Sequence, residues 1–327
     1  MRPRPSIASV TVAYNAEKCL GKNLDALLRQ TRILDEVIVV NNASTDGTLR
    51  MLAERYPQVS VLNLPHNVGA AGGFAEGLAY AARQKQHDFI WLFDDDSVPP
   101  DDGLESLLNG LVLATESKAN VGILAPLPIH SETKLSYPGL LWKSGWVQPS
   151  AIQLRDPVCF VDAVICSGTL VSREIVERVG LPRADFFMDF FDFEYCLRIR
   201  RRGYNVAMIS NSYLDHAVGN VRTVNFLGYS RAWADHAPWR EYYMSRNQTF
   251  TIWKDYPDWR SKFFIFRTLF RHAAGILLFG EEKLPCLKMM LKGFLDGKAG
   301  KLGDRFCTNL APMAGTAMPS EPMSASK

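Results

Sequence analysis

The alternation of short apolar runs with helix-patterned segments through the first hundred residues constrains the fold most. Ile7 to Val12 and the run "DEVIVV" are short and almost continuously apolar, as strands buried in a parallel sheet are. Between them, "EKCLGKNLDALLRQ" carries apolar residues at helical intervals. The same order recurs, with Ser44 or Thr45 as expected N-cap of the second helix, through "NNASTDGTLRMLAERY", "VSVLNLP", "NVGAAGGFAEGLAYAARQ" and "DFIWLF". These repeats predict an α/β fold whose open, mostly parallel sheet is covered by helices on both faces.

Polar residues follow three of these predicted strands. In an open parallel sheet, ligands bind beyond the carboxyl ends of the strands, where the chain changes direction. The residues at these ends are Tyr14 and Asn15, Asn41 and Asn42, and Asp94 to Asp96. We therefore expect all three clusters to face one crevice.

The stretch "WLFDDDSVPP" places three consecutive carboxylates directly after a buried apolar run. Such crowding of like charges is costly unless a cation or water covers it. Because side chains alternate along an extended strand end, Asp94 and Asp96 are expected to converge while Asp95 points away. Two convergent carboxylates suit Mg²⁺ or Mn²⁺ carrying a nucleotide diphosphate. The competing interpretation is a solvated acidic turn that caps a helix starting near Asp102.

A second acidic cluster lies in "DFFDFEYCLRIRRRGY", where Asp192 and Glu194 stand among phenylalanines. Partly buried acids have raised pKa values, so either residue is a candidate general base for deprotonating an alcohol. The alternative is that they cap the following helix and pair with its arginines, for example Arg198. His216, in "YLDHAVG", is by itself more typical of a surface or hydrogen-bonded histidine than of a ligand.

Composition narrows the class of protein. With 327 residues, 47% of them hydrophobic, the chain is long enough for a substantial core. A formal net charge of only +3 argues against a nucleic-acid partner recruited by overall basicity. Six scattered cysteines without CxxC pairs favour reduced thiols and a cytoplasmic location, and no secretory signal pattern opens the chain.

Positive charge is concentrated near the C-terminus. Between Lys254 and Arg305 there are eleven Lys or Arg against six Asp or Glu, a net charge of +5. The apolar stretch "KFFIFRTLFRHAAGILLFG" is interrupted by cationic residues and is too short to predict a membrane span. Two interpretations remain for this basic, aromatic region: peripheral contact with the inner face of the cytoplasmic membrane, or an ordinary helical subdomain or homo-oligomer contact.

Six ordered motifs resemble the inverting family 2 glycosyltransferases of the GT-A fold, and among them bacterial rhamnosyltransferases and galactofuranosyltransferases. The motifs are "VTVAYN", "VIVVNNASTDGT", "NVGAAGGF", "WLFDDDSVP", "FFDFEYCLRIRRRGY" and "YLDHAVG", and the resemblance covers roughly residues 6 to 250. It implies a Rossmann-like GT-A domain at 1–250, with a nucleotide-binding half at about 1–100 and an acceptor half at about 101–250. A basic helical region at 251–305 and a disordered tail at 306–327 complete the expected organisation.

The resemblance also implies roles for individual residues. Asp94 and Asp96 match the DxD element that meets Mn²⁺ or Mg²⁺ and the diphosphate, with Asp95 nearer the sugar or ribose. His216 matches the histidine that completes the metal shell. Asp192 matches the catalytic base, and Glu194 its supporting acid. The segments that hold the nucleotide are matched by Tyr14, Asn15, Asn41, Asn42, Asn67, Gly69 and Gly73.

The chain departs from the family pattern at two places. Asn41 and Asn42 stand where most relatives carry at least one aspartate, which changes the groups offered to a nucleobase. Phe190 and Phe191 precede Asp192 where some relatives have a further acid, so the base would stand alone. On the acceptor side, the aromatic and cationic candidates are Trp239, Tyr242 and Arg246, each of which is equally well explained as core.

The resemblance, together with these residues, implies a metal-dependent inverting glycosyltransferase. The expected donor is dTDP-rhamnose or UDP-galactofuranose, and the expected acceptor is a hydroxyl of a growing cell-surface glycan or of a polyprenyl-linked glycan. The alternatives are a nucleotide-sugar-binding protein without transfer, a nucleotidyltransferase-like enzyme and a transferase for another hexose. A metal site together with a separate acidic site favours an active transferase.

Overall fold

The structure is a computed structural model that describes residues 4–116, 119–129, 136–143, 145–150, 153–216, 221–226 and 229–306. The tail expected at 306–327 lies outside the described residues from 307 onward, and with it Cys307. The other five cysteines are free thiols.

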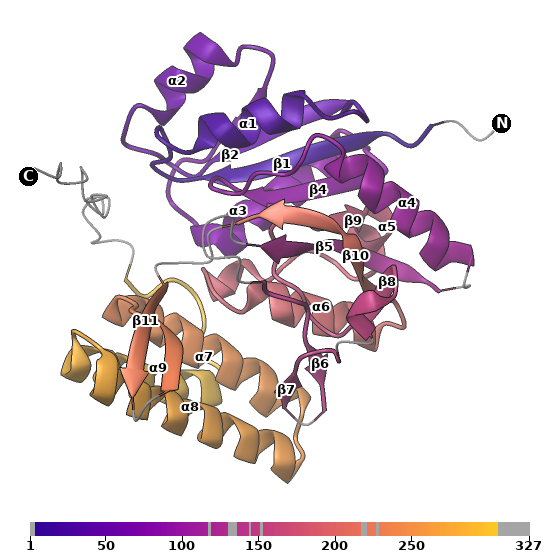
Figure 1. The fold of residues 1–327 in the computed structure, drawn as a ribbon. Helices are drawn as coiled ribbons and strands as arrows, with labels where there is room; N and C mark the ends of the chain where they lie inside the picture. The colour runs from indigo at the N-terminus through magenta and orange to yellow at the C-terminus, as the bar shows by residue number, and fades with distance from the viewer. Residues whose placement is uncertain are drawn as a thin grey trace, which may run out of the picture.

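One central sheet has the strand order β3-β2-β1-β4-β9-β5-β10-β8 (Figure 1). Its strands are β1 (Ile7–Ala13), β2 (Glu36–Asn41), β3 (Ser60–Asn63), β4 (Phe89–Asp94), β5 (Val121–Ile129), β8 (Val158–Val161), β9 (Leu170–Ser172) and β10 (Asn205–Asp215). The pairs among β1 to β4 and the pair β5/β10 are parallel, which confirms the mostly parallel sheet. The short strand β9 runs antiparallel between β4 and β5, and β8 runs antiparallel to β10.

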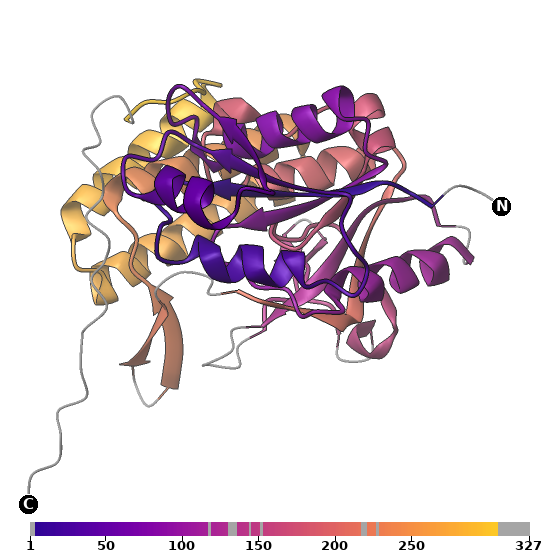
Figure 2. The same cartoon turned by 90° about the horizontal axis from the view of Figure 1, so that it is seen from above.

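Helices cover both faces of this sheet, as Figure 2 shows in a view turned by 90° from Figure 1. One face packs on α1 (Leu20–Leu28), α2 (Thr48–Arg55) and α4 (Gly103–Glu116), and the other on α3 (Gly69–Ala79), α5 (Arg173–Arg178) and α6 (Phe191–Arg201). The alternation along β1 explains the two layers: Ala8, Val10 and Val12 belong to the core under α3, whereas Ile7 and Ala13 belong to the core under α1.

The start of α2 differs from the prediction. Its N-cap is Gly47, so the N-cap expected at Ser44 or Thr45 is wrong. These two residues instead bond Asn15: the Asn15 N–H donates to Ser44 Oγ at 3.0 Å, and the Thr45 N–H donates to Asn15 Oδ1 at 2.7 Å. Ser44 and Thr45 therefore tie the loop after β2 to the loop after β1.

The chain order creates a switch point between β1 and β4. From β1 the chain moves outward to β2 and β3, then returns through α3 to β4 on the other side of β1. Val12 lies opposite Val40 in one neighbouring strand and Asp94 in the other. This is the place where open α/β sheets bind ligands, and it brings the loop after β1 next to the carboxylate triplet.

The C-terminal part is helical: α7 (Pro238–Asp255), α8 (Trp259–Phe279) and α9 (Lys283–Lys298) gather at one end of the molecule (Figures 1 and 2). Small hairpins are formed by β6 (Leu141–Trp142) with β7 (Trp146–Val147) and by β11 (Val221–Phe226) with β12 (Tyr229–Ala234). The boundary predicted at 250 falls inside α7, and the division into domains stays a prediction. Within the described chain, no helix has the length and apolar character needed to cross a bilayer.

Candidate active site

The structure brings Asp94, Asp96 and His216 together at the carboxyl ends of β4 and β10. His216 Nε2 lies 3.9 Å from Asp94 Oδ2, and His216 Nδ1 lies 3.3 Å from Asp96 Oδ1. Asp95 points away from this group, and its Oδ2 accepts a hydrogen bond of 3.2 Å from the Tyr14 N–H. Because side chains alternate along the triplet, Asp94 and Asp96 lie near His216, whereas Asp95 faces the end of β1.

Two buried serines hold the histidine in place. Ser97 Oγ lies 2.7 Å from His216 Nδ1 and accepts a hydrogen bond of 2.7 Å from Ser167 Oγ, which in turn accepts one of 3.0 Å from the Asp94 N–H. Asn23, on α1, donates to the Ser97 carbonyl at 2.7 Å. With Nδ1 occupied by Ser97 and Asp96, Nε2 is the ring nitrogen that faces Asp94. Sequence reasoning missed both serines, because their partners come from distant segments.

The charges at this site are unbalanced. Burial and the charge of Asp96 raise the pKa of Asp94 above its ordinary value, and the same two causes raise the pKa of Asp95 to about 7. Burial alone would lower the pKa of His216, but its hydrogen bond to Asp96 and the charge of Asp94 outweigh that effect and raise it. Among the described residues no Lys or Arg forms an ion pair with the triplet. A crowded, partly buried set of oxygen donors of this kind favours a bound cation.

The donor set fits a divalent metal in part. No group of three or more His, Cys, Asp or Glu side chains within the described residues is arranged to hold a metal ion on its own. Asp94 Oδ2 and His216 Nε2 nevertheless face each other, and Mg²⁺ or Mn²⁺ sites on nucleotide enzymes commonly use one or two protein ligands, with phosphate and water completing the shell. Asp96 faces the other ring nitrogen, where a carboxylate orients a ligating histidine.

Asp192 lies in the first turn of α6, on the α3 side of the sheet. Its Oδ1 accepts a hydrogen bond of 2.8 Å from the Phe193 N–H. Burial raises the pKa of Asp192 to about 7; the charges of Asp189 and Asp94 add to this, whereas the N–H groups of Phe193 and Cys166 oppose it. A carboxyl group that titrates near neutral pH is suited to proton transfer.

The other acids of this segment are already paired. Glu194 is buried and forms a two-pronged ion pair with Arg198, at 2.9 and 3.0 Å. The structure thus contains the helix ion pair, spaced four residues apart, and the supporting role of Glu194 in catalysis stays a prediction. Asp189 pairs with Arg240 at 3.0 Å, and the charge of Arg240 also lowers the pKa of Asp94. Arg240, which sequence reasoning missed, is the described cation that links the two acidic clusters.

The predicted nucleotide-binding residues shape the loops around the crevice. Asn42 Nδ2 donates to the Gly69 carbonyl at 3.1 Å, and Asn42 Oδ1 accepts from the Val68 N–H at 2.9 Å. Asn67 Oδ1 accepts from the Gly69 N–H at 2.8 Å. Asn41 Nδ2 donates to Asn63 Oδ1 at 2.9 Å. Asn41 and Asn42 are both 2% exposed, so the groups they offer are used within the protein, and nucleobase contact by these two side chains stays a prediction.

Gly69 and Gly73 allow α3 to approach its neighbours closely. Gly69 has φ +73°, and a Cβ there would lie 2.0 Å from the Phe187 carbonyl oxygen. A Cβ at Gly73 would lie 2.6 Å from Val12 Cγ1. The Ala71 N–H donates to the same Phe187 carbonyl at 3.0 Å. The glycine-rich loop therefore contacts the segment that carries the acidic cluster, which joins the two halves of the site.

That segment has a strained backbone. Phe187, Asp189 and Phe190 all have positive φ, at 66°, 55° and 65°, which costs bulky residues about 1–3 kcal/mol each. Asn247 Nδ2 lies within hydrogen-bond distance of the carbonyls of Phe186, Met188 and Asp189, at 3.0, 2.7 and 2.9 Å. Asn247 thus anchors this segment to α7 and keeps the residues just before Asp192 in an unfavourable conformation.

Arg246 belongs to the same anchor. It is fully buried and donates to the carbonyls of Asp185, Phe186 and Gly303. Tyr242 is also fully buried and bonds Asp296 at 2.9 Å. Of the two explanations for these residues, the structure favours the core one, because both side chains are fully buried. Trp239, in the first turn of α7, packs on Tyr243 of the same helix.

Asn247→Ala is expected to lower kcat more than it raises the donor KM. The change removes the Asn247 donor from the partly buried carbonyls of Met188 and Asp189, at about 1–3 kcal/mol each, and releases the strained segment before Asp192. We expect the melting temperature to fall, and steady-state rates to show the kcat effect in the folded fraction.

Ser245→Ala is the matched control for this variant. Ser245 Oγ is buried on the same helix and has no hydrogen-bond partner among the described residues, so its removal should leave both readings near wild type. Asn247→Ala with normal kcat would exclude a positioning role for Asn247.

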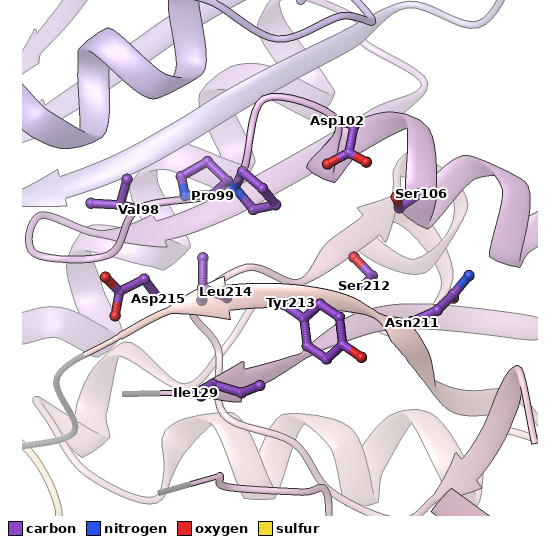
Figure 3. A pocket seen from close by; sticks show the side chains of 11 residues that line it. Val98, Pro99, Asp102, Ser106, Ile129, Asn211, Ser212, Tyr213, Leu214 and Asp215 are labelled. Carbon is purple, nitrogen blue, oxygen red and sulfur yellow. The ribbon is translucent and has the colours of Figure 1, made fainter. Parts of the chain in front are cut away.

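One cavity lined by described residues lies beside this site rather than in it. It has a volume of about 570 Å³ and lies between the segment that follows the triplet, the start of α4 and the end of β10 (Figure 3). Val98 and Asp215, which line it, are joined by a β-bridge that follows Ser97 and precedes His216. Asp192, in contrast, begins α6 on the opposite face of the sheet. The cavity is therefore lined neither by the carboxylate triplet nor by Asp192.

Comparisons with known proteins identify relatives of this chain. Residues 9–124 match the family model described as glycosyl transferase family 2. The dTDP-rhamnosyl transferase RfbF of Shigella flexneri is 28% identical over 300 residues, a match that covers 91% of this chain and 97% of the relative. The galactofuranosyltransferase GlfT1 of Mycobacterium tuberculosis is 28% identical over 257 residues, covering 76% of this chain and 82% of the relative.

Solved structures share the fold. A GalNAc-T7 complex with UDP, GalNAc and Mn²⁺ matches with a TM-score of 0.60 at 15% identity, covering 91% of this chain and 57% of that one. A complex of residues 1–349 of S. aureus TarS with UDP-GlcNAc matches with a TM-score of 0.55 at 15% identity, covering 89% of this chain and 81% of that one. At these identities the likeness concerns the fold alone, which is GT-A.

Proposed function

The chain is a family 2 glycosyltransferase with the GT-A fold, and we propose that it is a metal-dependent inverting enzyme that transfers L-rhamnose from dTDP-rhamnose. The proposed acceptor is a hydroxyl group of a growing cell-surface glycan or of a polyprenyl-linked glycan. The observation that carries this proposal is that Asp94 faces His216, while the charge of Asp94 also acts on the buried carboxyl of Asp192 and raises its pKa.

In the proposed reaction, Asp192 accepts the proton of the acceptor hydroxyl. The hydroxyl oxygen forms a bond to the anomeric carbon from the face opposite the diphosphate, while the bond from that carbon to the diphosphate oxygen breaks. The products are an inverted glycoside and a nucleoside diphosphate. Asp94 and His216 would hold a divalent cation, with Asp96 orienting His216, and the cation supplies positive charge against the departing diphosphate.

Coverage supports rhamnose over galactofuranose. Both relatives are 28% identical to this chain, but the rhamnosyl transferase match extends over 91% of the chain and the galactofuranosyltransferase match over 76%. Because the longer match covers 91% of the chain, it includes part of the C-terminal helices. UDP-galactofuranose is the competing donor.

A donor panel tests the proposal directly. The full chain is incubated with Mn²⁺ and, separately, with dTDP-rhamnose, UDP-galactofuranose, dTDP-glucose and UDP-glucose, and release of the nucleoside diphosphate is measured. Release is expected to be fastest from dTDP-rhamnose and to stop when EDTA removes the metal. Faster release from UDP-galactofuranose would replace the donor, and release that persists in EDTA would contradict the metal requirement.

A further inference from the structure

Helix α8 exposes a continuous apolar stripe. Trp259, Phe263, Phe266, Phe270 and Leu277 recur at helical spacing and are between 50% and 76% exposed. The opposite side of the same helix is buried through Phe264, Ile265 and Ile276. Monomeric surfaces rarely expose several large aromatic residues in one row, so the stripe requires a partner.

Helix α9 extends this surface. Leu284, Leu291 and Leu295 are between 55% and 69% exposed and again share one face of their helix. The two helices are joined by a short connection, and Phe266 of α8 packs against Phe294 of α9 with ring centroids 5.4 Å apart. We call the two rows together the α8–α9 apolar face.

Cations border this face. The two helices together carry eight Lys and Arg and a single acid, Asp296. On α8, the exposed residues Arg260, Arg267 and Arg271 lie one beside another along one edge of the aromatic row. On α9, the exposed Lys288 and Lys292 lie beside the leucines. Aromatic residues flanked by Arg and Lys are suited to the boundary between lipid headgroups and acyl chains.

We propose that the α8–α9 apolar face binds the surface of an anionic lipid bilayer, with the apolar rows at the level of the headgroups and the cations against the lipid phosphates. A second copy of the chain fits less well, because an isologous contact would bring this cationic surface against itself. The inference gives the proposed transferase a partner and in that respect rests on the proposed function, but its test requires no transfer.

Vesicle co-flotation of the full chain tests this assignment. Vesicles of phosphatidylcholine mixed with phosphatidylglycerol are compared with vesicles of phosphatidylcholine alone, at low and at physiological salt. The wild type is expected to bind the anionic vesicles more tightly, and Phe263→Ser with Phe270→Ser should weaken that binding at least about tenfold. Replacing Arg260, Arg267 and Arg271 by Gln should weaken binding to anionic vesicles and reduce its salt dependence.

Val112→Ser with Leu113→Ser is the matched control. These residues are 56% and 47% exposed on α4, away from the α8–α9 apolar face, so their change should leave vesicle binding as in the wild type. Equal binding by the wild type and the Phe263 and Phe270 double variant, or equal binding to anionic and neutral vesicles, would overturn the proposal. A wild-type dimer that this double variant converts to a monomer would assign the face to a second copy instead.

The two proposals fail separately. All the altered residues are exposed and lie outside the acidic clusters, so release of nucleoside diphosphate from dTDP-rhamnose in solution should be unchanged in every variant. A chain that binds vesicles but releases no nucleotide would contradict the proposed function only.

Discussion

Asp192→Asn is expected to reduce kcat by about 10²–10⁴-fold while the donor KM stays close to that of the wild type. Asn has nearly the same size as Asp and keeps an acceptor oxygen for the Phe193 N–H, but it cannot take a proton from an alcohol. Initial rates with saturating dTDP-rhamnose, acceptor and Mn²⁺ measure the effect. A variant that transfers near the wild-type rate would remove Asp192 from the role of base.

The rate should also follow the ionisation of Asp192. Because only the ionised carboxylate accepts a proton, and burial raises the pKa of Asp192 to about 7, kcat should rise with pH through the range below 7 and level off above it. The residual rate of Asp192→Asn should not change over the same range. A wild-type rate that is constant from pH 5 to pH 8, roughly two units below neutral to one unit above it, would contradict a base of this pKa.

The same substitution is expected to stabilise the fold at alkaline pH. In the unfolded chain the carboxyl ionises at its ordinary pKa of 3.8, whereas in the folded chain burial raises that pKa to about 7. The folded state therefore carries a cost that is absent below the lower pKa, grows as pH rises and is complete above the higher one. Full burial would make this cost about 4 kcal/mol, and the partial exposure of Asp192 reduces it to roughly 1–2 kcal/mol.

Thermal unfolding without metal tests this sign. The melting temperature of Asp192→Asn should exceed that of the wild type, by more at pH 8 than at pH 5, roughly one unit above and two below neutral. A residue with a merely structural role would lose stability on substitution. Increased stability together with lost transfer would therefore distinguish a catalytic carboxylate from a structural one.

The first half of the fold could be predicted because each strand and helix there is specified by its own residues. The apolar runs of β1, β2 and β4 are long enough to be recognised locally, and right-handed crossovers leave few arrangements for them. Strand β9 has three residues, and its antiparallel direction is set by pairing with β4 and β5, which lie far away in the sequence. The matched family model likewise covers only 9–124.

The site was predictable to the extent that its chemistry is local. The triplet and the Glu194 to Arg198 spacing can both be recognised in short stretches, and the structure contains the ion pair that the spacing allows. Arg240 and Asn247 could not be placed, because their partners lie about fifty or more residues earlier and depend on how α7 packs. The only signal in "WREYYMSRN" was its content of polar residues, because so many polar side chains are unusual in a helix this deeply buried.

Asp94→Asn is expected to weaken Mn²⁺ binding in the presence of dTDP by about 100-fold and to reduce transfer by a similar factor. An amide lacks the negative charge that makes Asp94 Oδ2 a strong ligand opposite His216 Nε2, while it keeps the size of the side chain. Calorimetric titration of Mn²⁺ into the complex with dTDP measures binding without any turnover.

Asp102→Asn is the matched control for this change, since Asp102 is an exposed carboxylate just before α4 that lines the neighbouring cavity and not the metal site. Its Mn²⁺ binding should equal that of the wild type. Unchanged Mn²⁺ binding in Asp94→Asn would show that the triplet does not hold the metal, even if transfer were lost. If Asp94→Asn lost both Mn²⁺ binding and transfer while Asp102→Asn kept them, a bound cation would be the charge that balances the crowded carboxylates after β4 in the active enzyme. Arg240 does not fill that role, because it is already paired with Asp189.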